Sequence, residues 1–254
     1  MNKLDLAIKI VRKVGYYLMQ HWGNIKEIEQ KSSFSDLVTK HDKYSQKIII
    51  ESIKKRFPND GILAEEGVFE NANNLWIIDP IDGTINYIHG LPNFAISIAY
   101  FEKERPIFGV VYSPPLNELF VGIKNEGSYL NSEKLKLEPK SKLEETVGSI
   151  SFSTNFTGKF ISLIEDKVRR IRILGSAAIS ACYVGAGKFD FFISKNANPW
   201  DIAAAFIVVK EAGGEILDFS GNKSNPLIKG NFIFTNPGIS NRIIEYVNKL
   251  GGIK

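Results

Sequence analysis

The stretch LWIIDPIDGT, residues 75–84, joins a run of apolar residues to two carboxylates three positions apart. The continuous apolar run predicts a strand that is covered on both faces. Asp79 and Asp82 would then lie at the mouth of a buried strand, where like charges repel and desolvation is costly. A divalent cation would offset that cost, because Mg²⁺ binds oxygen ligands and is completed by water or substrate phosphate.

The two residues that follow supply groups for an anion. Gly83 lets the backbone approach a ligand closely, and Thr84 begins a short predicted helix, TINYIHG. Free N–H groups at a helix start attract negative charge. A plain Asx-type turn between a strand and a helix is the alternative interpretation of DPIDG, because all of these residues favour turns.

Carboxylates also lie at one end of two other apolar elements. Glu65 and Glu66 follow the strand predicted at GILA, and Asp201 stands at the head of the Ala-rich helix predicted over residues 200–214. A solvated loop and an ordinary helix cap would explain them singly. Acidic residues at three places in the sequence, each at one end of a buried apolar element, favour a metal site.

Helices and strands alternate in blocks along the chain, which favours a layered α+β architecture. The apolar periodicity and turn residues predict helices over residues 3–22, 36–57, 158–168, 176–187, 200–214 and from 239 onward. Strands are predicted over residues 61–64, 75–79, 147–153, 170–175, 189–194, 215–219 and 231–236, with three or four antiparallel strands within 93–131. Residues 24–36 and 68–74 are predicted as polar connections.

Composition places the chain among ordinary globular proteins, with 44% hydrophobic and 24% charged residues among 254. A net charge of +4 is too weak to indicate nucleic-acid binding. The lone Cys182 excludes an internal disulfide and agrees with a cytoplasmic location. Charges interrupt the N-terminal segment throughout, so neither a signal peptide nor membrane insertion is expected.

Three other features of the sequence give less information about function. The basic run of Lys167, Arg169, Arg170 and Arg172 is either a solvated surface or a surface that attracts an anionic substrate. The segment VGAGKF is no phosphate-binding P-loop, because Cys182 and Phe189 stand where that motif needs Gly and Ser or Thr. The three histidines have no partner pattern around them and are expected to be structural.

Four segments, in this order, resemble the inositol monophosphatase family, within the superfamily that includes fructose-1,6-bisphosphatases. They are DLVTKHD at 36–42, ILAEEG at 62–67, WIIDPIDGTINYIHGLPNFAISIA at 76–99 and PWDIAAAFIVVKEAGGEI at 199–216. The resemblance implies the layered αβαβα sugar-phosphatase fold, a homodimer and inhibition by lithium. It further implies a single unit over 1–254, with a metal-site half at about 1–138 and a substrate half at about 139–254.

The resemblance also implies a Mg²⁺-dependent phosphate monoester hydrolase that holds two or three ions. The implied metal ligands are Glu65, Asp79, Asp82, Asp201 and the carbonyl of Ile81. Asp36 would hold a third metal or its water, and Thr84 would help Asp36 deprotonate the attacking water. The backbone of Gly83 and Thr84 would hold the phosphate.

Substrate contacts follow from the same resemblance. The segment RILGSAA at 172–178 resembles the sugar-contacting segment, which makes Gly175 and Ser176 candidates beside Asp82 and Asp201. Inositol-specific members carry Glu seven residues before the Asp that corresponds to Asp201, where this chain has Ser194 followed by Lys195. Lys195, with Arg170 or Arg172, could pair a second phosphate, as in the similar dual-activity archaeal enzymes.

The expected substrates are therefore inositol-1-phosphate and fructose-1,6-bisphosphate. A nucleotide 3′-phosphatase or NADP phosphatase of the same superfamily is one alternative. A non-enzymatic, RNA-associated regulatory member is a second alternative, from a different class.

Overall fold

The computed structural model describes residues 1–23, 28–30 and 37–250. Its first sheet contains eight strands: β3 Gly61–Ala64, β4 Val68–Glu70, β5 Asn74–Asp82, β6 Ala95–Glu102, β7 Arg105–Ser113, β8 Glu118–Ile123, β9 Gly127–Leu130 and β10 Glu133–Leu135. Their order is β10-β9-β8-β7-β6-β5-β3-β4. All neighbours are antiparallel except β3 and β5, which are parallel. A short separate pair consists of β1 Ile28–Gln30 and β2 Leu37–Thr39.

The second sheet contains five strands: β11 Val147–Ile150, β12 Arg170–Arg172, β13 Phe191–Ala197, β14 Glu215–Leu217 and β15 Gly230–Thr235. Their order is β12-β11-β13-β15-β14. The strands β12, β11 and β13 are mutually parallel, so their carboxyl ends meet at one edge of the sheet. Among the described residues, the chain passes from the first sheet to the second between β10 and β11, through the short helix η1 Leu143–Glu145.

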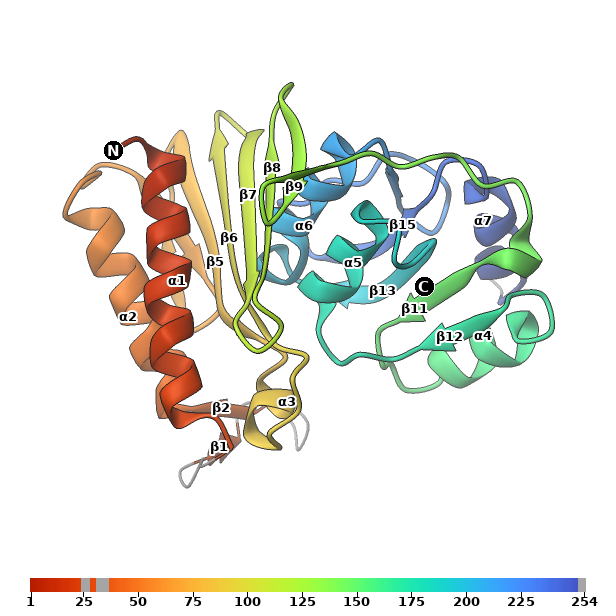
Figure 1. Ribbon diagram of the computed structural model, residues 1–254, viewed down its shortest axis with the longest axis horizontal. Helices are drawn as coiled ribbons and strands as arrows, with labels where there is room; N and C mark the ends of the chain where they lie inside the picture. The colour runs from red at the N-terminus through yellow and green to blue at the C-terminus, as the bar shows by residue number, and fades with distance from the viewer. Residues whose placement is uncertain (24–27, 31–36, 251–254) are drawn as a thin grey trace.

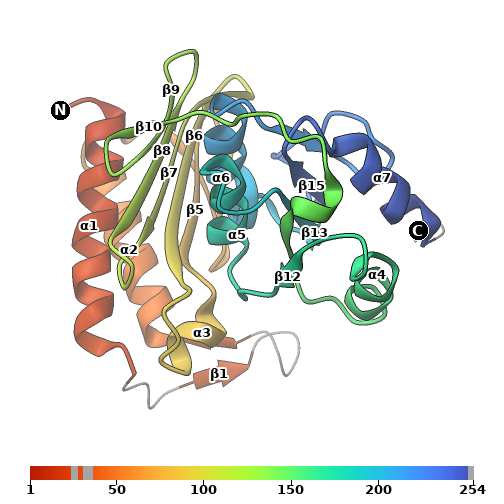
Figure 2. The same ribbon diagram turned by 45° about the vertical axis from the view of Figure 1, so that its right-hand side comes forward.

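The helices complete a five-layer arrangement (Figures 1 and 2). They are α1 Lys3–His21, α2 Lys40–Lys54, α3 Thr84–Ile88, α4 Thr157–Ile164, α5 Ala177–Gly185, α6 Pro199–Glu211 and α7 Ser240–Lys249. The helices α1 and α2 cover the outer face of the first sheet, α5 and α6 lie between the sheets, and α4 and α7 cover the second sheet. This is the predicted layered αβαβα fold, and the prediction is confirmed.

Alternation along the central strands explains why the layers pack on both faces. On β5, Ile77 belongs to the core shared with α5 and α6, whereas Trp76 and Ile78 belong to the core shared with α1 and α2. On β13, Phe192 faces the α5 and α6 core, whereas Ile193 belongs to the core under α4 and α7. Successive side chains on a strand point to opposite faces, so one apolar run supplies two cores.

The helix α6 lies unusually close to the first sheet because two strand positions opposite it lack side chains. A Cβ at Gly109 would stand 2.2 Å from the carbonyl oxygen of Ala204, and one at Gly122 would stand 2.6 Å from the amide nitrogen of Val208. Any larger residue would push α6 outward. This contact fixes the position of the helix whose first turn carries Asp201.

Several sequence-based boundaries were wrong. The helix predicted from residue 36 begins at Lys40, because Leu37–Thr39 form β2 and Thr39 caps the helix. The predicted polar connection at 68–74 contains β4, which pairs with β3. The antiparallel strands predicted within 93–131 are confirmed as β6 to β9, and β10 follows them outside that range. The helix predicted to reach residue 168 ends at Ile164.

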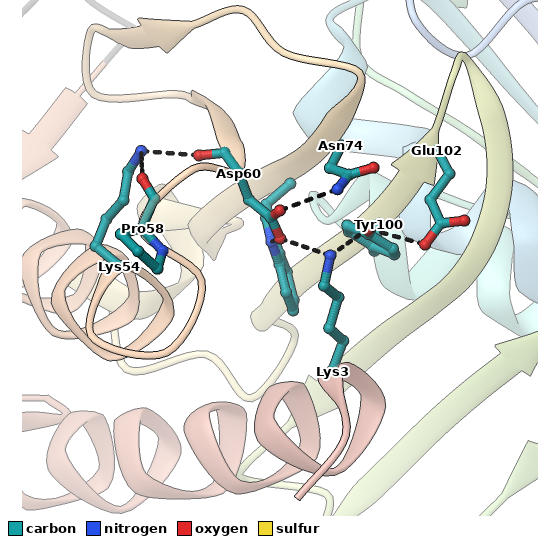
Figure 3. A network of polar contacts seen from close by, with 8 residues as sticks. Lys3, Lys54, Pro58, Asp60, Asn74, Tyr100 and Glu102 are labelled. Atoms are coloured by element: carbon teal, nitrogen blue, oxygen red, sulfur yellow. Dashed lines mark hydrogen bonds and ion pairs between the residues drawn. The ribbon is translucent and has the colours of Figure 1, made fainter.

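A network around Asp60 joins the start of α1 to the first sheet (Figure 3). The Asp60 carboxylate lies 2.7 Å from the Lys3 ammonium and accepts hydrogen bonds from the Trp76 indole N–H at 2.8 Å and from the Asn74 amide at 3.2 Å. Lys3 also donates to the Tyr100 hydroxyl, which donates to Glu102. The Asp60 carboxylate is buried, and its three direct partners, Lys3, Trp76 and Asn74, all offer it N–H donors.

Among the described residues, no helix combines the length and the apolar character needed to cross a bilayer.

Replacement of Asp60 tests the network. We expect Asp60→Ala to lower the free energy of unfolding by about 3 kcal/mol, because it leaves a partly buried ammonium and an indole N–H without their acceptor. Urea unfolding followed by circular dichroism measures the change. The control is Glu51→Ala, which removes the exposed partner of Lys47 and should cost less than about 1 kcal/mol. Equal losses of unfolding free energy in Asp60→Ala and Glu51→Ala would contradict the stabilising role of the Asp60 network.

Candidate active site

A bulge in β5 brings Asp79 and Asp82 to the same side of the sheet. Asp79 pairs with Ser97 on β6 and Asp82 pairs with Ala95, so three steps along β5 oppose two steps along β6. In a regular strand, residues three apart point to opposite faces, and the extra residue corrects this. The Asx-turn alternative is also partly right, because the Ile81 N–H donates to the Asp79 carboxylate at 3.0 Å.

Two further carboxyl groups reach the same place from other elements. Glu65 follows β3, whose parallel pairing of Ala64 with Ile78 sets Glu65 level with Asp79. Asp201 lies in the first turn of α6 and accepts a hydrogen bond from the Asn198 N–H at 2.7 Å. It is therefore the third helical residue of the α6 capping arrangement, with Asn198 as the cap.

These four carboxyl groups line one cavity of about 180 Å³. The other lining residues are Leu37, Ile81, Gly83, Thr84, Ile85 and Gly175. Gly83 has a left-handed conformation, with φ 90°, and a Cβ there would stand 2.8 Å from the carbonyl oxygen of Asn93. A residue with a side chain would be strained and crowded at this position. The structure thus brings together most of the residues predicted from the sequence.

Burial and mutual repulsion shape the protonation of the cluster. Burial raises the pKa of Asp79 well above its ordinary value, and the charges of Glu65, Asp82 and Asp201 raise it further. Burial raises the pKa of Asp201 to about 7, with smaller contributions from the charges of Asp82 and Glu65. A metal-free cluster therefore retains protons near neutral pH, which is the behaviour of carboxylates that lack a cation.

Asp82 is held by the second half of the chain. Its carboxylate accepts hydrogen bonds from the Ser176 hydroxyl and from the N–H groups of Ala177 at 3.1 Å and Ala178 at 2.9 Å, all at the start of α5. Burial raises the pKa of Asp82 to about 6, and these donors oppose the rise. The hydroxyl of Ser176, a predicted substrate contact, is thus engaged by Asp82.

The donor set suits Mg²⁺. It consists of four carboxyl groups and the Ile81 carbonyl, all oxygen atoms, beside space for water or phosphate. In the described part of the chain, no three acidic, His or Cys side chains are already arranged to hold an ion. The carboxyl groups of Asp79 and Asp82 contact Glu65, peptide N–H groups and Ser176.

Asp42 is the functional candidate that sequence reasoning missed. The Thr84 hydroxyl lies 2.9 Å from an Asp42 carboxylate oxygen and 2.9 Å from the Ile81 carbonyl oxygen. Asp36, predicted as the partner of Thr84, lies outside the described residues. Asp42 is fully buried, and the other oxygen of its carboxylate accepts from the Thr39 N–H at 2.8 Å and hydroxyl at 2.6 Å. The spacing Thr39-x-x-Asp42 is a capping-box signal that could have located it.

The predicted specificity residues lie outside the cavity lining, except Gly175. Arg170 is exposed on β12, and Ser194 is buried within β13. The Lys195 ammonium stands 5.7 Å from the centre of the Phe156 ring. Since β11, β12 and β13 are parallel, the ends of these strands still share one edge of the second sheet.

The five-layer fold and the acidic cavity together define a protein of the sugar-phosphatase class. Residues 2–251 match the model of the inositol monophosphatase family, and the chain belongs to that family. It is 51% identical over 250 residues to a fructose-1,6-bisphosphatase/inositol-1-monophosphatase of Thermotoga maritima, covering 98% of this chain and 97% of that protein.

Two solved structures are similar over nearly the whole chain. The Thermotoga maritima IMPase has a TM-score of 0.95 and 51% identity, with 98% of each chain covered. An IMPase/NADP phosphatase complexed with Mg²⁺ and phosphate has a TM-score of 0.88 and 29% identity, covering 98% of this chain and 95% of that one.

The raised pKa values predict an unusual pH dependence of stability. A carboxyl group with a raised folded-state pKa binds its proton more tightly in the folded protein, so stability is greatest at low pH and is lost as pH rises through that pKa. In EDTA, the melting temperature should therefore fall between about pH 5 and pH 8, and Mg²⁺ should raise it more at pH 8.

Asp201→Asn is the matched variant for this measurement. It removes a group whose pKa is about 7, so differential scanning fluorimetry in EDTA should show a flatter pH profile and a smaller Mg²⁺ effect. A wild-type melting temperature that rises with pH over the same range, or a pH profile that Asp201→Asn leaves unchanged, would contradict the explanation by repulsion among the carboxyl groups.

Proposed function

We propose that this protein is a Mg²⁺-dependent phosphate monoester hydrolase that acts on inositol-1-phosphate and fructose-1,6-bisphosphate. The observation that carries the proposal is the cavity in which four carboxyl groups meet beside Thr84 and Gly83. The substrate pair rests on the relative that is 51% identical and carries both activities in its name.

The proposed metal ligands are Glu65, Asp79, Asp82, Asp201 and the Ile81 carbonyl, with two or three ions held. When bound, Mg²⁺ would lower the pKa of the attacking water and neutralise charge on the phosphate and the leaving oxygen. The oxygen-only chemistry of the set and the excess of negative charge support this assignment.

The protein's own groups would orient the water and the phosphate. The Thr84 hydroxyl would hold the attacking water, and its contact with Asp42 offers a route for the proton from that water to a carboxylate. The backbone N–H groups of Gly83 and Thr84 would orient the phosphate, at a point where the absence of a Cβ leaves room. Asp36 remains a second candidate for the water-binding role.

The substrate's remaining groups would be bound from the second half of the chain. We propose that Gly175 contacts the sugar or inositol ring, and that Lys195 with Arg170 attracts the second phosphate of a bisphosphate. Ser194, in place of the Glu of inositol-specific members, supports a relaxed preference. A homodimer, a cytoplasmic location and inhibition by lithium complete the expected properties.

Variants of the Thr84–Asp42 pair test the mechanism. We expect Asp42→Asn and Thr84→Val each to lower kcat about 10²- to 10⁴-fold with little change in KM, because each removes a group that handles the proton of water. Steady-state phosphate release with Mg²⁺ measures this. The same test on Asp36→Asn compares the two acids, and an unaffected kcat in Asp42→Asn would remove Asp42 from the mechanism.

Substrate ranking tests the specificity. We expect phosphate release from both inositol-1-phosphate and fructose-1,6-bisphosphate, abolished by EDTA. Lys195→Ala should lower kcat/KM about tenfold for the bisphosphate and leave kcat/KM for inositol-1-phosphate unchanged. The reason is that only the bisphosphate has a second phosphate whose contact with the ammonium is lost. Lys159→Ala, an exposed lysine on α4, is the control. Absence of hydrolysis of either compound would refute the proposed function.

A further inference from the structure

A groove between α1 and α2 is lined almost wholly by cationic and apolar side chains. It encloses about 250 Å³ where α1 begins and α2 ends. Leu6 and Ile10 contribute apolar surface from α1. The charged residues that line it are Lys9, Lys13, Lys55 and Arg56, and no acidic side chain is among the lining residues.

These four cations are exposed and unpaired. In the described part of the chain, no Asp or Glu oxygen lies within 4 Å of the charged nitrogens of any of them. The other cations at the same helix ends behave differently, because Lys3 pairs with Asp60 and Lys54 pairs with Glu70. Figure 3 shows Lys3 and Lys54 turned toward the Asp60 network. Where α1 begins and α2 ends, Lys3 and Lys54 are therefore neutralised by carboxylates, whereas the four cations that line the groove are not.

The nearest acids on the two helices do not neutralise the groove. Asp5 belongs to the capping box of α1, where it accepts from the Asn2 N–H and its own N–H donates to the Asn2 side chain. Glu51 lies 3.9 Å from Lys47, one turn before it on α2. Four like charges around one small hollow repel one another, and this repulsion would be relieved by an anion of several charges.

We propose that this groove binds a small polyanion that carries two or more adjacent phosphate groups. Lys9 and Lys13 stand one helical turn apart on α1, and Lys55 and Arg56 line the same hollow from the end of α2, so donors from two elements surround it. Such an arrangement holds neighbouring phosphates from both sides by charge-assisted hydrogen bonds. A nucleic acid is disfavoured, because the cations are confined to one hollow and the chain's net charge is only +4.

The groove is separate from the acidic cavity. Lys55 follows Asp42 by thirteen residues along α2, which corresponds to about 20 Å at the rise of an α-helix. The proposal therefore does not depend on the function proposed for the acidic cavity. A polyanion bound here would leave the cavity free for substrate.

Calorimetric titration with tripolyphosphate and with ATP tests the proposal. The buffer contains EDTA and little salt, so that the metal-free acidic cavity repels both compounds and screening is weak. The variant Lys13→Ala/Arg56→Ala should bind at least about tenfold more weakly than the wild type, because two donors are lost. The control Lys159→Ala/Lys229→Ala makes the same charge change at exposed sites elsewhere, and should retain wild-type affinity.

The two compounds distinguish the source of the phosphates. Equal affinities would indicate that the polyphosphate chain alone is recognised, and tighter binding of ATP would indicate that the apolar floor contacts the nucleoside. No saturable binding of either compound to the wild type, or equal weakening in both double variants, would overturn the proposal. Binding of a short single-stranded RNA that is lost in Lys13→Ala/Arg56→Ala, with no saturable binding of tripolyphosphate, would overturn it in favour of a nucleic-acid surface.

Discussion

Mutual repulsion among four carboxyl groups, two of them buried and two partly buried, is the constraint on which the rest of this structure depends. Glu65, Asp79, Asp82 and Asp201 come from β3, β5 and α6, and an apolar protein interior would not tolerate them without compensation. The structure provides that compensation in two ways: raised pKa values, and peptide N–H donors at the start of α5. The cation proposed for this cavity would supply a third.

The first sheet and the helices α5 and α6 meet at this cavity. Asp82 belongs to a strand of the first sheet, yet its hydrogen-bond donors come from α5, which packs between the sheets. Asp201 belongs to α6, which is held against the first sheet where Gly109 and Gly122 leave space. A displacement between the layers would thus separate the acids from one another, which couples the packing of the core to the geometry of the cavity.

Asp60 shows how a structural carboxylate differs from a functional one. Its buried charge is surrounded by a lysine, an indole N–H and an amide, and it serves to hold α1 on the sheet. The acids in the cavity have other acids as neighbours instead. A buried carboxyl group surrounded by like charges contributes to function at the expense of stability, and this difference separates the two sites without reference to any relative.

Much of the site was predictable because its signals are local. A carboxylate directly after a buried apolar run marks the end of a strand, and this identified Asp79, Asp82 and Glu65; Asp201 was found from its place at the start of an Ala-rich helix. The start of α2 was misplaced because residues 37–39, which directly precede it, were assigned to the helix although they form β2. Asp42 was missed for a different reason, since its role depends on a contact with Thr84, 42 residues away.

The sequence by itself determined the order of the layers' elements, the family resemblance and the acidic residues of the cavity, because each is encoded in a few consecutive positions. Only the tertiary structure decided that a bulge turns Asp79 and Asp82 to one side, that Ser176 serves Asp82, and that four unpaired cations meet between α1 and α2. Those features arise from register and from helix packing, which join residues far apart in the chain and leave no local pattern.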